Sequence, residues 1–173
     1  MKKTITIFGS SIPKQGDEEY SIAYELGKLL AQNNFSVCTG GYSGIMEAAS
    51  KGAVEFGSEA VGVTVRDWKT IPNKFLTQNI VCENLFERIQ ILIQSADGFV
   101  ILKGGTGTLL ELAVVWEFIN KNILPVKPVA CHSSMWQKIV GVIEIQIQSE
   151  QRKTNLVKCF DNIDDIVNHL KTQ

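Results

Sequence analysis

Cysteine is scarce in this chain, with four residues in 173 that stand far apart. They are Cys38, Cys82, Cys131 and Cys159, and no two of them form the C-x-x-C pair that metal and redox sites commonly use. Each has apolar neighbours in the sequence, where a free thiol behaves as a small hydrophobic side chain. The sequence therefore argues against a bound metal and against a disulfide framework.

Long apolar runs and blocks of like charge are also missing. The chain carries 17 Lys and Arg against 18 Asp and Glu, for a net charge of −1. This balance argues against binding to the phosphate backbone of a nucleic acid. Residues 1–3 lead straight into the alternating pattern TITIF, without an apolar stretch or a small-residue cleavage site. We therefore expect no secretion signal, no association with a membrane, and a cytoplasmic protein.

Two common nucleotide-binding motifs are absent as well. A dinucleotide-binding fold needs G-x-G-x-x-G after its first strand and an acidic residue at the end of its second, but these positions read GSSIPK and TG. A P-loop needs Lys-Ser or Lys-Thr after its last glycine, whereas Gly107 is followed by Thr108 and Leu109. The sequence thus disfavours NAD binding and P-loop ATP hydrolysis, and we expect no bound cofactor.

The most informative stretch that is present runs from Phe99 to Glu117. It begins with the apolar run FVIL, which is typical of a strand buried on both faces of a parallel sheet. The turn KGGTGT follows, and then apolar residues at helical spacing. This order suits a phosphate, because the free N–H groups and the positive dipole end of a helix favour an anion. The simpler alternatives are a tight strand-to-helix turn and a capping box of Thr108 and Glu111.

The rest of the chain alternates between strand and helix patterns. Strands are expected at residues 4–8, 35–38, 60–65, 80–82, 99–102, 126–131 and 156–160, and helices at about 17–33, 45–56, 84–95, 109–119, 133 or 134 to 148, and 163–171. Asp161 is the expected cap of the last helix, and polar residues 66–78 form an expected loop near the ligand site. The pattern predicts one Rossmann-like domain over residues 1–173, an α/β fold of three layers around a doubly wound parallel sheet.

In such sheets, ligands bind outside the carboxyl ends of the strands, where the strand order reverses. The turns at residues 9–11, 40–44 and 104–108 all follow predicted strands. We therefore expect these turns to line one crevice, in which backbone amides and threonine hydroxyls would hold a monophosphate.

The same turns resemble those of a known family. Residues 103–111, KGGTGTLLE, are similar to P-G-G-x-G-T-x-x-E, the signature of the Lonely Guy (LOG) family, with a lysine in place of the leading proline. Residues 40–47, GGYSGIME, are similar to its G-G-G-x-x-G-L-M-G, and residues 9–11 match its G-S-S. The family contains cytokinin nucleoside 5′-monophosphate phosphoribohydrolases. The resemblance, over roughly residues 4–131, implies a homodimer or larger homo-oligomer that hydrolyses a nucleoside monophosphate such as AMP to free base and ribose 5-phosphate.

Residue chemistry and resemblance together define a candidate site. Glu111 and Arg88 are the candidate catalytic residues: Glu111 would stabilise positive charge on the sugar and orient a water, and Arg88 would bind phosphate or hold Glu111. The candidate nucleotide-binding residues are Gly9, Ser10, Gly41, Tyr42, Met46, Gly104, Gly105, Thr106, Gly107 and Thr108. Simpler roles are a helix cap for Glu111, a solvated position for Arg88, core packing for Met46 and a turn for Tyr42.

Departures from the family pattern keep a second function open. Arg88 matches the first residue of the family's Arg-Lys pair, but Ile89 stands where the lysine is expected, and Lys103, Tyr42 and Glu47 also differ. Molybdenum cofactor carrier proteins share this fold and glycine turn and bind without this hydrolysis. The alternative is therefore a non-catalytic protein that binds a nucleotide or the pterin of the molybdenum cofactor.

Overall fold

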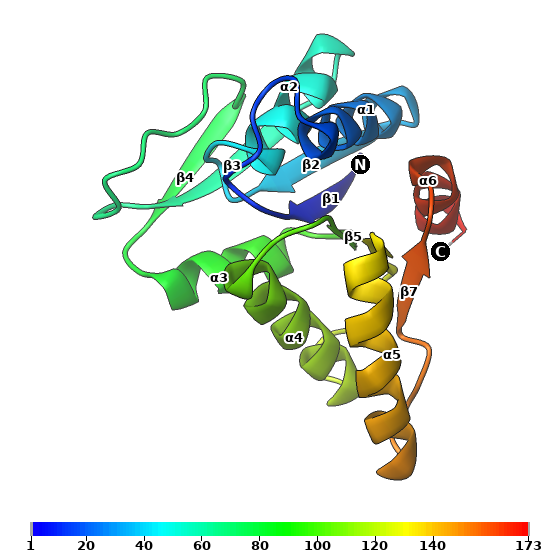
Figure 1. The fold of residues 1–173 in the computed structure, drawn as a ribbon. Coiled ribbons are helices and arrows are strands. Elements are labelled where there is room, and N and C mark those ends of the chain that lie inside the picture. The colour runs from blue at the N-terminus through cyan, green and yellow to red at the C-terminus, as the bar shows by residue number, and fades with distance from the viewer. Residues whose placement is uncertain (1, 173) are drawn as a thin grey trace.

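The alternation of apolar strands and amphipathic helices produces an α/β fold around one parallel sheet (Figure 1). In residues 2–172, the part of the chain that this computed structural model describes, the sheet has seven strands in the order β4-β3-β2-β1-β5-β6-β7, and every neighbouring pair is parallel. The predicted doubly wound, Rossmann-like fold is confirmed. Residues 1 and 173, which the predicted domain includes, lie outside the described residues.

The strands are β1 (Lys3–Phe8), β2 (Phe35–Thr39), β3 (Ala60–Val65), β4 (Gln78–Cys82), β5 (Gly98–Ile101), β6 (Val129–His132) and β7 (Val157–Phe160). The helices are α1 (Glu18–Gln32), α2 (Ile45–Glu55), α3 (Leu85–Gln94), α4 (Thr106–Asn120), α5 (Ser134–Ser149) and α6 (Ile163–Lys171).

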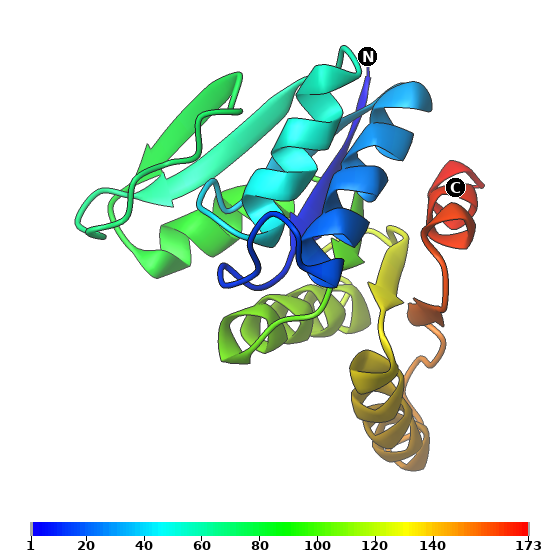
Figure 2. The ribbon, with the colours of Figure 1, turned by 45° about the horizontal axis from the view of Figure 1, so that its top comes forward.

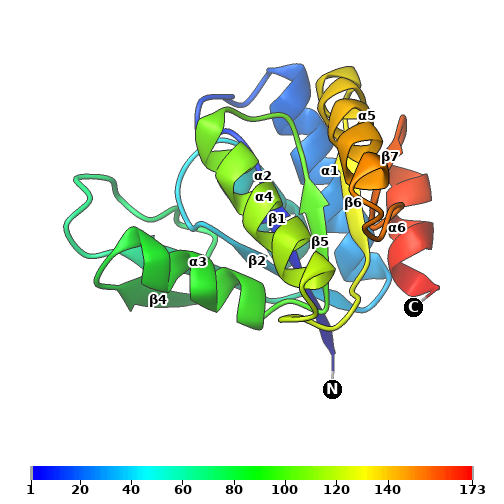
Figure 3. The ribbon, with the colours of Figure 1, turned by 90° about the horizontal axis from the view of Figure 1, so that it is seen from below.

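The helices form two outer layers. Helices α1, α2 and α6 cover one face of the sheet, where Figure 2 shows α1 and α2 side by side. Helices α3, α4 and α5 cover the other face and lie in front of the strands in Figure 3. Strand β5 is buried from both sides, since Val100 packs into the first layer while Phe99 and Ile101 pack into the second. This double burial explains its uninterrupted apolar sequence.

The strand order reverses between β1 and β5, the two central strands of the sheet. The chain winds outward from β1 to β4 and then returns through α3 to β5 on the other side of β1. Hydrogen bonds join the turns after these strands: the amide of Ser10 donates to the carbonyl of Lys103 at 3.1 Å, and the amide of Ile45 donates to the carbonyl of Ser10 at 2.9 Å. The three turns predicted to meet therefore lie together at the point of reversal.

Two local predictions are wrong, and one of the simpler alternatives for the glycine turn is excluded. Strand β6 begins at Val129 rather than Val126, because Pro128 lacks the amide donor that a central strand needs. The cap of α6 is Asn162, whose side chain accepts from the amide of Asp165 at 2.9 Å, whereas Asp161 accepts from a glutamine of α5. Helix α4 begins at Thr106, with Gly105 as its N-cap, so the capping box of Thr108 and Glu111 does not form.

The cysteines and the helices add two further observations. All four cysteines are free, and Cys131 and Cys159, 28 positions apart in the sequence, are register partners on β6 and β7. Within residues 2–172, no helix combines the length and the apolar character that a membrane crossing requires, and no group of three or more His, Cys, Asp or Glu could hold a metal ion.

Candidate functional site

A cavity of about 330 Å³ opens where the strand order reverses, within the size range of small-molecule sites. Its walls come from the end of β1, the turn after β2, the start of α2, the loop after β3, one residue of α3 and the first turns of α4. The lining residues are Ile7, Phe8, Gly9, Ser10, Ser11, Ile12, Gly40, Met46, Trp68, Arg88, Gly105, Thr106, Gly107, Thr108 and Glu111. A single cavity thus collects residues from all three predicted turns.

The N-terminus of α4 provides the anion-binding part of this cavity. The first amides of a helix have no carbonyl partner within the helix, and the N-cap residue Gly105 offers them no side chain. Gly105, Thr106 and Gly107 are exposed to the cavity, and a Cβ at Gly105 or Gly107 would enter open space. The missing side chains therefore leave the amides open to a ligand.

Arg88 and Glu111 form a buried ion pair beside this helix start. One terminal nitrogen of Arg88 donates to Oε1 of Glu111 at 3.4 Å, and the Nε of Arg88 donates to the carbonyl of Val63 at 2.8 Å. The two side chains are only 7% and 11% exposed. The structure thus brings the two candidate catalytic residues together, and it makes Arg88 a buried residue rather than a solvated one.

Burial changes the chemistry of Glu111. Desolvation raises the pKa of its carboxyl to about 7, although the positive charge and hydrogen bond of Arg88 act in the opposite direction. Near neutral pH both the ionised and the protonated form are therefore populated. A carboxyl with this pKa can take up or release a proton under physiological conditions.

Gly40 makes room for this ion pair. A Cβ at this position would lie 1.8 Å from a terminal nitrogen of Arg88 and 2.7 Å from the sulfur of Met46. Any larger residue would displace the guanidinium from Glu111 or shift the turn after β2. Gly40 is therefore a positioning residue, and it was not among the predicted site residues.

The predicted binding residues separate into two groups. Most of them line the cavity: Gly9, Ser10, Met46, Gly105, Thr106, Gly107 and Thr108. Gly41, Tyr42 and Gly104 do not, and Tyr42 is 3% exposed, with its hydroxyl accepting from the amide of Val65 at 2.8 Å. Tyr42 therefore stands behind the cavity wall.

The positions that depart from the Lonely Guy pattern lie away from the cavity lining. Lys103 is exposed and forms an ion pair with Glu19, whose hydrogen bond raises the pKa of the lysine. Glu47 accepts a hydrogen bond from the hydroxyl of Tyr20 at 3.2 Å, and Ile89 packs in the core on the α3 face of the sheet.

Trp68 lines the cavity but was not among the predicted site residues. It lies in the polar, aperiodic loop between β3 and β4, which was expected near the ligand site without any residue being named. The one usable signal was the tryptophan itself, one of three in the chain.

Comparisons with known proteins extend this description. An uncharacterized protein of Archaeoglobus fulgidus is 33% identical over 112 residues, which cover 65% of this chain and 73% of that protein. A cytokinin riboside 5′-monophosphate phosphoribohydrolase of Mycobacterium tuberculosis is 29% identical over 170 residues, which cover 94% of this chain and 90% of that enzyme. The solved structure of the molybdenum cofactor carrier protein from Chlamydomonas reinhardtii superposes with a TM-score of 0.78 at 23% identity over the full length of both chains, which supports the fold alone.

The family assignment follows from the sequence match. The model of the SLOG cluster4 family matches residues 2–161, which is nearly the whole chain and includes every residue of the cavity. Relatives named phosphoribohydrolases agree with the Lonely Guy resemblance of the glycine turns. That resemblance is confirmed at the level of the family: the chain belongs to the SLOG cluster4 family.

Proposed function

We propose that the protein is a nucleoside 5′-monophosphate phosphoribohydrolase, which hydrolyses the N-glycosidic bond to free base and ribose 5-phosphate. The observation that carries this proposal is the buried Arg88–Glu111 pair in the same cavity as the open N-terminus of α4. The relatives named for this reaction support it.

The phosphate binds at the start of α4. The amides of Thr106, Gly107 and Thr108 face an anion there, and the hydroxyls of the two threonines can donate further hydrogen bonds. Glu111 lies farther along the same helix, so its carboxylate is placed past the phosphate. A phosphate in this position directs the sugar of the nucleotide toward Glu111.

Glu111 acts on the sugar. Breaking the bond between C1′ and the base sends the electron pair to the base nitrogen and leaves positive charge on the ribose ring. The ionised carboxylate stabilises that charge and accepts a proton from the water whose oxygen bonds to C1′. The departing base nitrogen takes up one proton from solvent, and Glu111 releases its proton to solvent, so that one water is consumed and the carboxylate is restored. The low polarity that raises the pKa of Glu111 also strengthens its interaction with a neighbouring cation.

Arg88 holds Glu111 in place. Its guanidinium is fixed by the carbonyl of Val63 and confined by Gly40. Because arginine stays protonated at all physiological pH values, it serves as a fixed cation rather than a proton carrier. This supports a role in orienting Glu111 and attracting the phosphorylated substrate.

A second candidate is a binding protein without hydrolytic activity, for a nucleotide or for the pterin of the molybdenum cofactor. The buried Ile89 favours it, since the family's second cationic residue is missing beside Arg88. The molybdenum cofactor carrier protein from Chlamydomonas reinhardtii shares the fold, which is compatible with this function.

The deciding experiment measures base release from AMP and other nucleoside monophosphates by chromatography. Glu111→Ala should abolish release, whereas Glu117→Ala, at an exposed position of the same helix, should leave it unchanged. Release that survives in Glu111→Ala would contradict the proposed role of Glu111. AMP binding without release in the unaltered protein would favour the binding function.

We also propose a homodimer or larger homo-oligomer, as the Lonely Guy resemblance implies. Apolar side chains exposed on α4 and α5 support this, among them Leu109 at 42%, Val142 at 68% and Ile145 at 72% exposure. Light scattering of the purified protein tests it, and a monomeric mass at all concentrations would contradict it.

A further inference from the structure

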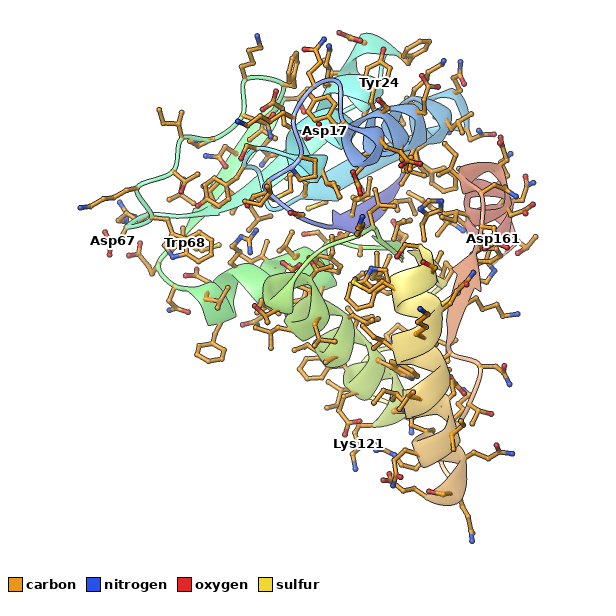
Figure 4. All side chains as sticks on the ribbon, viewed as in Figure 1. Asp17, Tyr24, Asp67, Trp68, Lys121 and Asp161 are labelled. Atoms are coloured by element: carbon orange, nitrogen blue, oxygen red, sulfur yellow. The ribbon has the colours of Figure 1, made fainter. Side chains whose placement is uncertain are left out.

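Trp68 gives the cavity an exposed aromatic surface. The side chain lines the cavity together with the start of α4 and Glu111, and it is 42% exposed. The other two tryptophans, Trp116 and Trp136, are 5% and 1% exposed and belong to the core. In Figure 4, Trp68 lies on the loop after β3, on the side of that loop that faces α3. A large apolar ring is thus kept open to a polar ligand site.

The ring of Trp68 is held from behind. It stacks on the ring of Tyr42, with centroids 5.6 Å apart and planes inclined by 25°. Both residues are tied to Val65: its amide donates to the hydroxyl of Tyr42 at 2.8 Å, and its carbonyl accepts from the amide of Trp68 at 3.3 Å. The buried tyrosine therefore fixes the orientation of the tryptophan before any ligand arrives.

Trp68 also adjoins the proposed catalytic pair. The guanidinium carbon of Arg88 lies 5.4 Å from the centroid of Trp68 and 5.8 Å from that of Tyr42, within the range of cation–π attraction. Arg88 in turn contacts Glu111. The aromatic ring therefore lies beside Arg88 in the cavity, whereas the amides proposed to bind phosphate lie at the start of α4.

We propose that Trp68 is the base-recognition residue of this site, on which the nucleobase of the bound monophosphate stacks, and that Tyr42 is its positioning residue. This rests on the proposed function, since it takes the ligand to be a nucleotide. A nucleotide has an anionic end and a flat aromatic end joined by a sugar. In the cavity, the amides of α4 can bind the anionic end and the indole of Trp68 can stack on the aromatic end. Glu111 lines the same cavity and can act on the bond between base and sugar.

The test separates the base from the rest of the ligand. Affinities for AMP and for ribose 5-phosphate, which lacks the base, are measured by calorimetry in a Glu111→Gln background, where AMP is not consumed. Adding Trp68→Ala should weaken the binding of AMP by about tenfold or more, which is the usual effect of removing one base–aromatic stack. The affinity for ribose 5-phosphate should change less than twofold. Trp68→Phe should retain most of the AMP affinity. Ile71→Ala, at an 87% exposed position of the same loop, is the matched control and should change neither.

Tyr42→Phe keeps the ring but removes the hydroxyl that forms the hydrogen bond with the amide of Val65. It should therefore weaken the binding of AMP less than Trp68→Ala does and leave the affinity for ribose 5-phosphate unchanged. Equal losses for both ligands in Trp68→Ala would show that Trp68 acts through Arg88 and would overturn the inference, as would unchanged AMP affinity. If Trp68→Ala selectively weakens the binding of AMP but the unaltered protein releases no base, the proposed hydrolysis is refuted and the proposed base stacking is supported. If the background protein binds neither ligand, both proposals fall.

Discussion

Replacing Glu111 by glutamine should stabilise the folded protein increasingly as the pH rises. Glutamine keeps the shape of the side chain and an oxygen that can accept from Arg88, but it cannot ionise. In the folded chain, desolvation raises the pKa of Glu111 from 4.5 to about 7. The unfolded chain therefore loses its proton at lower pH than the folded chain, and the stability contributed by the protonated form is lost as the pH rises from about 4.5 to about 7.

The size of the effect follows from this difference. At about 1.4 kcal/mol for each pKa unit, the full loss is about 3.5 kcal/mol, of which about 2 to 3 kcal/mol falls between pH 5 and pH 8. The free energy of unfolding of Glu111→Gln relative to the unaltered protein should therefore increase by this amount between the two pH values. Because the side chain of Glu111 is only 11% exposed, solvent screening reduces the effect little.

Urea denaturation at pH 5, 6, 7 and 8 measures this difference. Glu117→Gln, on the exposed side of the same helix, shows how much a glutamine substitution in α4 changes stability on its own. A difference between Glu111→Gln and the unaltered protein that stays constant from pH 5 to pH 8 would refute the reasoning, because Glu111 would then ionise in the folded chain as it does in water.

Four further predictions follow from the same geometry. If the ionised form of Glu111 is the active one, kcat/KM for AMP should fall about tenfold for each pH unit below about 7, and a rate that rises instead would assign the active role to the protonated form. Gly40→Ala should reduce base release at least tenfold, because its methyl group would collide with Arg88; unchanged kinetics would show that the turn adapts. Gly107→Asp should weaken the binding of AMP and of inorganic phosphate through charge repulsion, as measured by calorimetry. Its melting temperature should stay the same or rise in thermal melts, since an acidic residue stabilises the first turn of a helix. Leu92→Ala should cost about 2 to 5 kcal/mol in urea denaturation, because Leu92 is fully buried, and a loss below about 1 kcal/mol would contradict its place in the core.

The fold could be predicted because its signals are local. The apolar run of β5, the glycine turn after it and the spacing of apolar residues in α4 all lie between residues 98 and 120. The reversal of strand order beside β1 then follows from general rules for parallel sheets. The meeting of Arg88 and Glu111 was expected from the family resemblance rather than from the pattern of either helix.

The parts that sequence analysis missed depend on contacts between distant segments. Nothing near Gly40 in the sequence shows that a guanidinium from α3 fills the space beside it. Tyr42 was predicted to line the ligand cavity, but stacking on Trp68 and bonding to Val65 draw it behind the wall. The loop that carries Trp68 has no periodicity, and most of its residues are exposed, so no buried face marks it in the sequence.

The reversal of strand order also bears on how ligands for this protein can be found. Because the cavity joins residues from Ile7 to Glu111, it exists in the folded chain and not in any isolated segment. A compound that occupies it therefore adds its binding free energy to the stability of the whole sheet, by about 2.7 kcal/mol at a concentration of one hundred times Kd. Thermal-shift screening of phosphorylated metabolites can thus reveal the natural ligand without any assumption about the reaction.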